Sequence, residues 1–322
     1  TLGGGMGWLT RLGGLSSDNL VAAEVVTADG NIVRASADER PDLFWAIRGG
    51  GGNFGIVTSF EFRLHKVGPI VQLALSFWDL DHGPDAFRAA RDQLGGAADD
   101  LAIFLAALNA PPAPFVPDQH QGAPGYAVLV VGHGSTEAHA AAVTALRQAA
   151  PPLFAFDTPI PYTALQQMFD ESAPWGIRGY EKAVYLDELS DAAIEVIARH
   201  VPRKASPMSF MPVFVLGGEY ARHAEDDSAF GGQRTTGYVL NIAAIAPTPE
   251  LLEADRGWVR AFWADLVPHA SGVGSYVNFM SEYEQDRIRA SYGPKKYDRL
   301  SHLKAEYDPD NVFHINANIR PA

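Results

Sequence analysis

The first sixty residues alternate between short apolar stretches and turns. Val21–Thr27 and Asn31–Ala35 have the composition of strands, and the turn Ala28-Asp29-Gly30 between them predicts a β-hairpin. Asp38–Ile47 is expected to form a short helix, which the glycines at 49–52 end. This part of the chain therefore predicts a strand pair followed by a helix.

A third strand is expected over Ile56–Leu64, because the sequence alternates there with a period of two. One face of this strand would carry Ile56, Thr58, Phe60, Phe62 and Leu64.

The region after a break at Lys66–Pro69 mixes strand-like and helix-like patterns. The predicted strands are Ile70–Trp78, Leu101–Leu108, Tyr126–Gly132, Met208–Leu216 and Tyr238–Ala246. The predicted helices are Pro84–Leu94, Thr136–Ala150, Ser190–His200 and Thr248–Leu266. The proline-rich stretch Ala110–Gly125 is expected to be an exposed loop. Hairpin-like spacings mixed with helices indicate an α+β fold, with an antiparallel sheet flanked by helices.

The last fifty residues change character again. Lys296–Tyr307 is expected to be a helix that ends at Asp308-Pro309. Its apolar stripe consists of Tyr297, Leu300, Leu303 and Tyr307.

Composition and charge exclude several classes of protein. The 322 residues carry a net charge of −13, which argues against a nucleic-acid partner, since such proteins need basic surface to bind phosphates. No apolar run is long enough to span a membrane. The chain has no cysteine, so disulfides, thiolate metal sites and cysteine nucleophiles are excluded within it.

The opening TLGGGMGWLT lacks an initiator methionine and shows no signal peptide. We therefore expect more chain upstream of Thr1. We also expect a cytoplasmic protein, with secretion left open because a signal would precede Thr1.

Two glycine clusters are candidate ligand sites, because backbone without Cβ atoms can approach a ligand closely. Gly50-x-Gly52-x-x-Gly55 has the spelling of a dinucleotide fingerprint, but a helix precedes it and a strand follows, which is the reverse of the order that fingerprint needs. The other cluster comprises Gly3, Gly4, Gly5 and Gly7; taken alone, it reads as a flexible terminal run.

Other catalytic motifs are absent from the sequence, and no metal site is expected. There is no hydrolase, P-loop or zinc-protease motif, and the ten histidines form no pair at metal-binding spacing. The tail is rich in tyrosine and asparagine, side chains that can act as acid or base or bind the edge of a heterocycle. Core packing explains the same residues on chemistry alone.

Four stretches together resemble one family. TLGGGMGWLTRLGGLSSDNL and PDLFWAIRGGGGNFGIVTSFEFRL are similar to the second half of the FAD domain of the vanillyl-alcohol-oxidase (PCMH-type) superfamily. LGGEYARHAEDDSAFGGQR and the tail YGPKKYDRLSHLKAEYDPDNVFHINANIRP resemble its berberine-bridge-enzyme branch. They cover nearly the whole chain in family order.

The resemblance implies a partial FAD domain, discontinuous in sequence, around a substrate domain with an antiparallel sheet. The expected division is residues 1–68 for the FAD domain, 69–270 for the substrate domain, and 271–322 for a tail returning to the FAD domain. It implies FAD as the cofactor and a small-molecule substrate held between the domains. The reaction would pass a hydride from an alcohol, sugar or natural product to flavin N5, with O2 as acceptor.

The same resemblance implies roles for particular residues. Gly3, Gly4, Gly5 and Gly7 would lie along the flavin, with Asp18 and Asn19 supporting their loop. Asn53, Gly55, Ile56 and Val57 would run beside the adenosine portion. Tyr276 and Asn278 would lie near the isoalloxazine, and Asn316 and Asn318 would close the site. Candidates for the substrate side are Arg178, Tyr180 and Tyr185.

Two departures from the family pattern matter. The R-x-G-G-H loop and the cysteine that tether flavin in many members are absent and would lie upstream, so this stretch alone is expected to bind FAD weakly or not at all. Many members also carry Tyr-x-Asn-Tyr with the last tyrosine as base, whereas this chain has Tyr276-Val-Asn278-Phe279. Phenylalanine cannot take a proton, so either Tyr276 or another residue is the base, or the reaction differs; Tyr276 is the candidate.

Two other functions are compatible with the sequence. One is a flavin-linked dehydrogenase or cyclase that does not use O2. The other is a flavin-free binding protein on a degraded oxidase scaffold.

Overall fold

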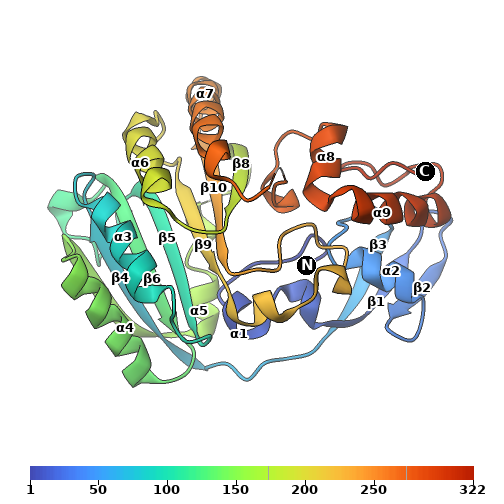
Figure 1. Ribbon diagram of the computed structural model, residues 1–322, viewed down its shortest axis with the longest axis horizontal. Coiled ribbons are helices and arrows are strands. Elements are labelled where there is room, and N and C mark those ends of the chain that lie inside the picture. The colour runs from blue at the N-terminus through green and yellow to red at the C-terminus, as the bar shows by residue number, and fades with distance from the viewer. Residues whose placement is uncertain (173, 273) are drawn as a thin grey trace. The chain divides into compact units, whose positions relative to one another are not determined.

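The computed structural model describes residues 1–172, 174–272 and 274–322. The chain divides into two compact units (Figure 1). The first unit contains Thr1–His65, Gly217–Thr235 and Gly272–Ala322, and the second contains Lys66–Leu216 and Thr236–Ser271. Both combine helices with antiparallel strands, which confirms the α+β class.

The first unit is built around a three-stranded antiparallel sheet in the order β2-β1-β3. Its strands are β1 (Leu20–Val26), β2 (Ile32–Ser36) and β3 (Ile56–Phe62). Its α-helices are α1 (Thr10–Gly13), α2 (Pro41–Ile47), α8 (Gln285–Tyr292) and α9 (Pro294–Tyr307). Short 3-10 helices are η1 (Ser16–Asn19), η5 (Gly218–Arg222), η6 (Glu225–Asp227) and η8 (Val277–Phe279).

The core of the first unit joins stretches that lie far apart in the sequence. The predicted hairpin supplies Ala23 and Val25, and α2 supplies Ile47. From the tail, α9 supplies Leu300 and the last residues supply Ile319. The helical stripe predicted for α9 is therefore confirmed for Tyr297, Leu300 and Leu303, which are all buried.

The alternation predicted for β3 is wrong, because a β-bulge interrupts it. The register with β1 shifts between Glu24 and Val25, so that Val57 pairs with Val25 and Phe60 pairs with Ala23. Paired residues point to the same side of a sheet, so Val57 and Phe60 lie on one face and Ile56 lies on the other. Leu64 lies beyond the strand and is 88% exposed.

The second unit contains a seven-stranded antiparallel sheet in the order β7-β4-β6-β5-β9-β10-β8. Its strands are β4 (Ile70–Trp78), β5 (Leu101–Asn109), β6 (Pro124–Gly132), β7 (Phe154–Pro161), β8 (Arg178–Leu186), β9 (Met211–Leu216) and β10 (Gly237–Ala246). Its α-helices are α3 (Gly83–Leu94), α4 (Thr136–Ala149), α5 (Tyr162–Gln166), α6 (Asp191–His200) and α7 (Pro249–Leu266). Its 3-10 helices are η2 (Asp118–His120), η3 (Asp170–Ser172), η4 (Val201–Arg203) and η7 (Val267–His269).

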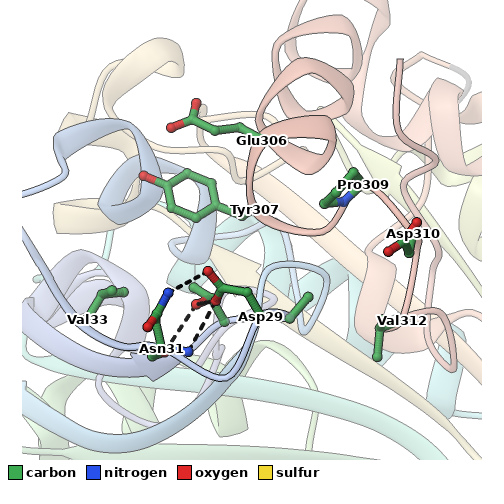
Figure 2. A pocket seen from close by; sticks show the side chains of 10 residues that line it. Asp29, Asn31, Val33, Glu306, Tyr307, Pro309, Asp310 and Val312 are labelled. Atoms are coloured by element: carbon green, nitrogen blue, oxygen red, sulfur yellow. Dashed lines mark hydrogen bonds between the residues drawn. The ribbon is translucent and has the colours of Figure 1, made fainter.

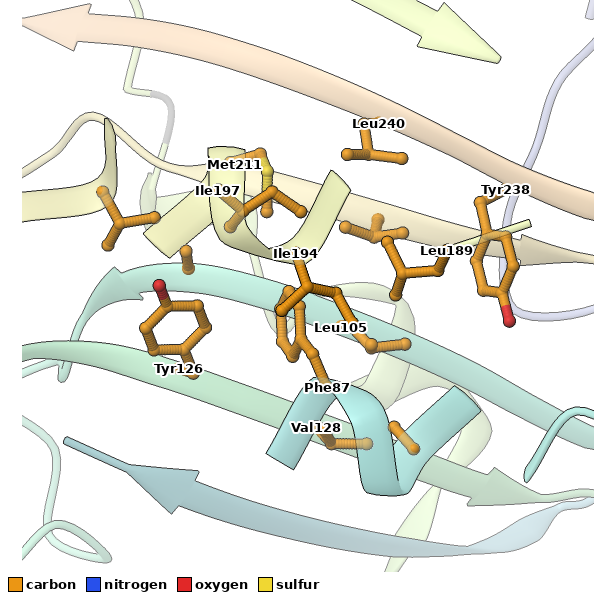
Figure 3. Close-up of a cluster of buried hydrophobic side chains, with 14 of the residues drawn as sticks. Phe87, Leu105, Tyr126, Val128, Leu189, Ile194, Ile197, Met211, Tyr238 and Leu240 are labelled. Atoms are coloured by element: carbon orange, nitrogen blue, oxygen red, sulfur yellow. The ribbon is translucent and has the colours of Figure 1, made fainter. Parts of the chain in front are cut away.

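Helices α3, α4, α6 and α7 bury apolar side chains against one face of this sheet, and Figure 3 shows the part around Phe87 and Ile194. Phe87 from α3 and Ile194 from α6 meet Leu105, Val128 and other alternate residues of the strands. Hydroxyl caps fix where three of these helices begin: Ser135, Ser190 and Thr248 accept N–H groups of α4, α6 and α7. Every helix among the described residues is too short or too polar to cross a membrane.

Gly217–Thr235, the 217–235 segment, connects β9 to β10 in the sequence but packs with the first unit. The division expected from the sequence leaves this segment inside residues 69–270. The Trp45 indole N–H donates to the carbonyl of Asp226, and Ala229 N–H donates to the carbonyl of Trp45. These bonds hold the segment against α2.

Candidate cofactor site

The glycine loop, Gly3–Gly7, folds back onto the residues that follow α1. Gly4 and Gly5 have φ angles of +126° and +96°, which other residues rarely adopt. Their carbonyl oxygens accept the N–H groups of Ser17 and Ser16 at 2.9 and 3.0 Å. The loop therefore has a defined conformation in the folded protein, unlike the flexible run that its sequence alone suggests.

Tyr276 and Asn278 lie directly against the glycine loop. The Gly5 N–H donates to the Tyr276 hydroxyl oxygen at 2.9 Å, and the Asn278 amide donates to the same oxygen at 2.6 Å. A Cβ atom on Gly3 would stand 2.2 Å from Asn278 Oδ1, so a larger residue would displace this amide. The structure thus brings the start of the chain and its aromatic–amide tail into contact.

The Tyr276 hydroxyl is enclosed, and its side chain is only 3% exposed. The ring lies edge-on to Phe230, with 5.9 Å between the ring centroids. Burial raises the pKa of Tyr276, while N–H groups of Gly5, Asn278 and Met6 oppose that rise without cancelling it. Tyr276 is therefore a neutral phenol at neutral pH.

Substitution Gly4→Ala should destabilise the protein by about 1–3 kcal/mol, the cost of a residue held in a sparsely populated backbone region. Its Cβ would also lie 2.9 Å from the Phe230 ring. Urea unfolding measures the difference. Gly7→Ala is the control, since nothing lies within 4 Å of a Cβ there, and it should change stability by less than about 0.5 kcal/mol. Equal losses in the two variants would contradict the prediction.

The second glycine cluster forms a turn that fastens the tail. The buried Asn53 amide donates to the carbonyls of Gly50 at 2.8 Å and Ala317 at 3.1 Å, and its oxygen accepts Ile319 N–H at 3.0 Å. These bonds occupy both the amide nitrogen and the amide oxygen of the Asn53 side chain. The role of this side chain in the structure is to hold the tail to the turn.

Asn316 and Asn318 each bury an amide oxygen that has no hydrogen-bond partner among the described residues. Such orphaned acceptors usually mark a place that a ligand or water fills. Asn316 Nδ2 also lies 2.8 Å from where a Cβ would stand on Gly52. Bare backbone beside amide groups fits the polar edge of a heterocycle such as those in FAD.

Asp18 and Asn19 support the chain next to the glycine loop. Asp18 Oδ2 accepts the Leu15 N–H at 2.8 Å, and Asn19 Nδ2 donates to the carbonyls of Gly13 and Leu15 at 2.7 and 2.9 Å. Both side chains therefore hold Gly13–Leu15 in place.

Gly55, Ile56 and Val57 lead from the glycine turn into β3. A Cβ on Gly55 would come within 2.5 Å of Val25, so glycine permits the close approach to β1. Val57 packs against the core, and Ile56 is exposed.

Charged residues that sequence reasoning missed hold this region together. Lys304 and Asp308 form an ion pair in which both side chains are 0% exposed. Lys304 Nζ also donates to the carbonyls of Asn53 and Phe313 at 2.7 and 2.8 Å. Hydrogen bonds from Lys304 and from two backbone N–H groups outweigh burial and hold the pKa of Asp308 below its ordinary value. The sequence signal that could have predicted this ion pair is the i, i+4 spacing of Lys304 and Asp308 at the end of a helix.

A pocket of about 390 Å³ lies elsewhere in the first unit, between the β1–β2 turn and the end of α9 (Figure 2). Asp29 on its wall accepts hydrogen bonds from Thr27 and Asn31, and these lower the pKa of its carboxyl group. This carboxylate stabilises the turn. None of the expected cofactor residues lines the pocket.

The three substrate-side candidates lie on β8 of the second unit. Tyr180 is part of the core on the helix side and accepts a hydrogen bond from Arg260 of α7, and Arg178 donates to the carbonyl of Pro247. Tyr185 is buried. Within the described residues, no group of three or more histidine or carboxylate side chains is arranged to hold a metal ion.

The chain is 30% identical over 354 residues to (R)-6-hydroxynicotine oxidase of Paenarthrobacter nicotinovorans, a match covering 99% of this chain and 69% of that protein. The chain belongs to the berberine-bridge-like FAD-linked oxidoreductases. The family described as "Berberine and berberine like" matches residues 275–320. An FAD-linked oxidoreductase of Dictyostelium discoideum is 28% identical over the whole chain and 67% of its own length.

Solved structures of this oxidoreductase family show the same fold. The 6-hydroxy-D-nicotine oxidase of Arthrobacter nicotinovorans superposes with a TM-score of 0.80 at 24% identity, over 100% of this chain and 70% of that one. The BBE-like 1 protein of Physcomitrella patens gives 0.84 at 21% identity, over 99% and 69%. The chain thus spans about two thirds of the length of these relatives.

These matches confirm an FAD-linked oxidoreductase with FAD as its cofactor. A flavin-free binding protein no longer accounts for the chain.

Proposed function

We propose that this oxidoreductase is an oxidase of a small alcohol, sugar or natural product. FAD, when bound, would supply the hydride acceptor at N5 and pass the electrons to O2. The observation that carries the proposal is the Tyr276 hydroxyl placed inside the glycine loop, 2.9 Å from Gly5 N. The Tyr276 hydroxyl, which can exchange a proton, therefore lies against the glycine backbone that would face a flat cofactor.

The proposed cofactor contacts follow from the geometry around this hydroxyl. Gly3, Gly4, Gly5 and Gly7 would line the flavin, with Asp18 and Asn19 behind them. The backbone at Asn53, Gly55, Ile56 and Val57 would lie along the adenosine portion. Asn278, Asn316 and Asn318 would bind heterocycle edges through their amide groups.

Tyr276 is proposed to hold and move the proton of the substrate. Since its resting form is a neutral phenol, its proton must leave before it can act as a base. The N–H groups of Gly5 and Asn278 would then stabilise the phenolate oxygen.

Several similar proteins are oxidases, among them the nicotine oxidase and a carbohydrate oxidase of Microdochium nivale, which shares the fold. This favours an oxidase over a dehydrogenase or cyclase that does not use O2. To test it, the flavin of the purified holoprotein is reduced with dithionite and mixed with aerated buffer. An oxidase reoxidises rapidly and forms one hydrogen peroxide per flavin. Slow reoxidation would identify the dehydrogenase instead.

A further inference from the structure

Asp18 and Arg234 form a buried ion pair beside the glycine loop. Their side chains are 3% and 2% exposed. The guanidinium donates to both carboxylate oxygens, at 2.9 Å from NH1 to Oδ2 and 2.6 Å from NH2 to Oδ1. Such a two-bond pair fixes orientation as well as charge.

The 217–235 segment presents this arginine between two aromatic rings. The guanidinium carbon lies 4.7 Å from the ring centroid of Phe230 and 5.2 Å from that of Tyr220. His223, from the same segment, comes to 3.8 Å from Asp18 Oδ2 and is also near Glu219 and Asp227. The pair is thus set in a packed site that holds Arg234 in one orientation.

Two sets of hydrogen bonds, joined by the backbone of Leu15–Ser17, connect the ion pair to the glycine loop. Asp18 binds the Leu15 N–H through Oδ2, the same oxygen that receives one bond from Arg234. The next two residues, Ser16 and Ser17, donate their N–H groups to the carbonyls of Gly5 and Gly4. A shift of the Asp18 carboxylate would therefore move the loop.

Phe230, four residues before Arg234, reaches the same loop from another point. Its ring lies 2.9 Å from where a Cβ would stand on Gly4 and packs edge-on to Tyr276. The carbonyl of Phe230 accepts a hydrogen bond from Lys296 Nζ, which holds it to α9. The 217–235 segment therefore contacts the glycine loop directly through the Phe230 ring. It is linked to the loop indirectly through the Arg234–Asp18 pair.

A contribution to folding stability does not by itself explain why the protein has this buried pair, because apolar replacements of buried ion pairs are often neutral or stabilising. We propose that Arg234 is a positioning residue of the FAD site, whose two-bond contact with Asp18 sets the backbone of Gly3–Gly7 for the flavin. The proposal depends on the glycine loop being the flavin site, as proposed above.

The test compares Arg234→Met, Arg234→Lys and a control, Arg147→Met. Arg147 forms a two-bond pair with Asp157 in the second unit, at 2.7 and 2.6 Å, with the two side chains 22% and 53% exposed. Three quantities are measured for each: the melting temperature, the Kd of FAD for the apoprotein, and the visible absorption band of the bound flavin.

Arg234→Met is expected to shift the flavin band and to raise the Kd of FAD by ~10-fold to ~100-fold, by analogy with the loss of a residue that orients a metal ligand. Arg234→Lys should recover most of the melting temperature, since it restores the charge, but not the FAD affinity, since a lysine cannot make the two-bond contact. Arg147→Met should leave the Kd and the flavin band unchanged.

Full recovery of FAD affinity by Arg234→Lys, or a Kd that is unchanged in both Arg234 variants, would overturn the proposal. If Arg234→Met does not fold, Arg234→Lys against wild type still decides between these outcomes. A wild-type holoprotein whose glycine-loop variants bind FAD normally would instead refute the assignment of the loop, so the two failures are distinguishable.

Discussion

Substituting phenylalanine for Tyr276 is expected to slow reduction of the bound flavin by substrate by roughly 10²–10⁴-fold, the usual range for loss of a general acid–base group. The change removes only the hydroxyl that Gly5 and Asn278 bind, while the ring can remain against Phe230. Anaerobic stopped-flow absorbance of the flavin measures the rate. Tyr126→Phe, which removes a buried hydroxyl from the helix-side core of the second unit, should leave it unchanged.

The pH dependence gives the same hypothesis a second check. A base acts in its deprotonated form, and burial raises the pKa of Tyr276 above its ordinary 10.0. The reduction rate of wild type should therefore rise about tenfold per pH unit up to that raised pKa, and the phenylalanine variant should lack this rise. A reduction rate that stays within about twofold of wild type in Tyr276→Phe would assign the base to another group.

Lys304→Met should lower the free energy of unfolding by about 3–5 kcal/mol, the usual cost of breaking a buried ion pair from one side. The variant leaves the Asp308 carboxylate buried without its cation and removes the donor from two backbone carbonyls. Urea unfolding followed by circular dichroism measures the loss.

The matched control is Lys295→Met on the same helix, whose pair with Asp226 is 85% and 65% exposed. Exposed pairs contribute little, so this variant should lose less than about 1 kcal/mol. The double variant Lys304→Met with Asp308→Asn should regain part of the stability, because it removes the uncompensated charge. Similar losses of unfolding free energy in the two lysine variants would contradict the prediction that the buried pair stabilises the protein more than the exposed one.

The hydrophobic periodicity of the sequence and its turn residues predicted most helices and strands of this oxidoreductase. The strand β4 has the bounds that its alternation predicts, and α9 buries its predicted stripe. β7 was missed because Pro159 and Pro161 argue against a strand, and the structure accommodates them in an edge strand. The bulge in β3 was missed because one additional residue leaves no signal in the alternation itself.

The candidate site was predictable only in part. Glycines and amide side chains can be recognised by type, and the structure brings Gly3 to Asn278 and Gly52 to Asn316. Arg234 could not be predicted, because its partner Asp18 lies 216 residues away and nothing local marks the pair. The orphaned oxygens of Asn316 and Asn318 depend on side-chain geometry, which no sequence pattern encodes.

The assembly of the first unit from three stretches has a consequence for biosynthesis. Its β1–β2 hairpin leaves the ribosome well before Leu300 and Ile319, which belong to the same core. At 5–20 residues per second, roughly ten seconds or more separate these events. Until then the hairpin lacks the core contacts of Leu300 and Ile319, so we expect chaperone supply and translation speed to affect the yield of native protein.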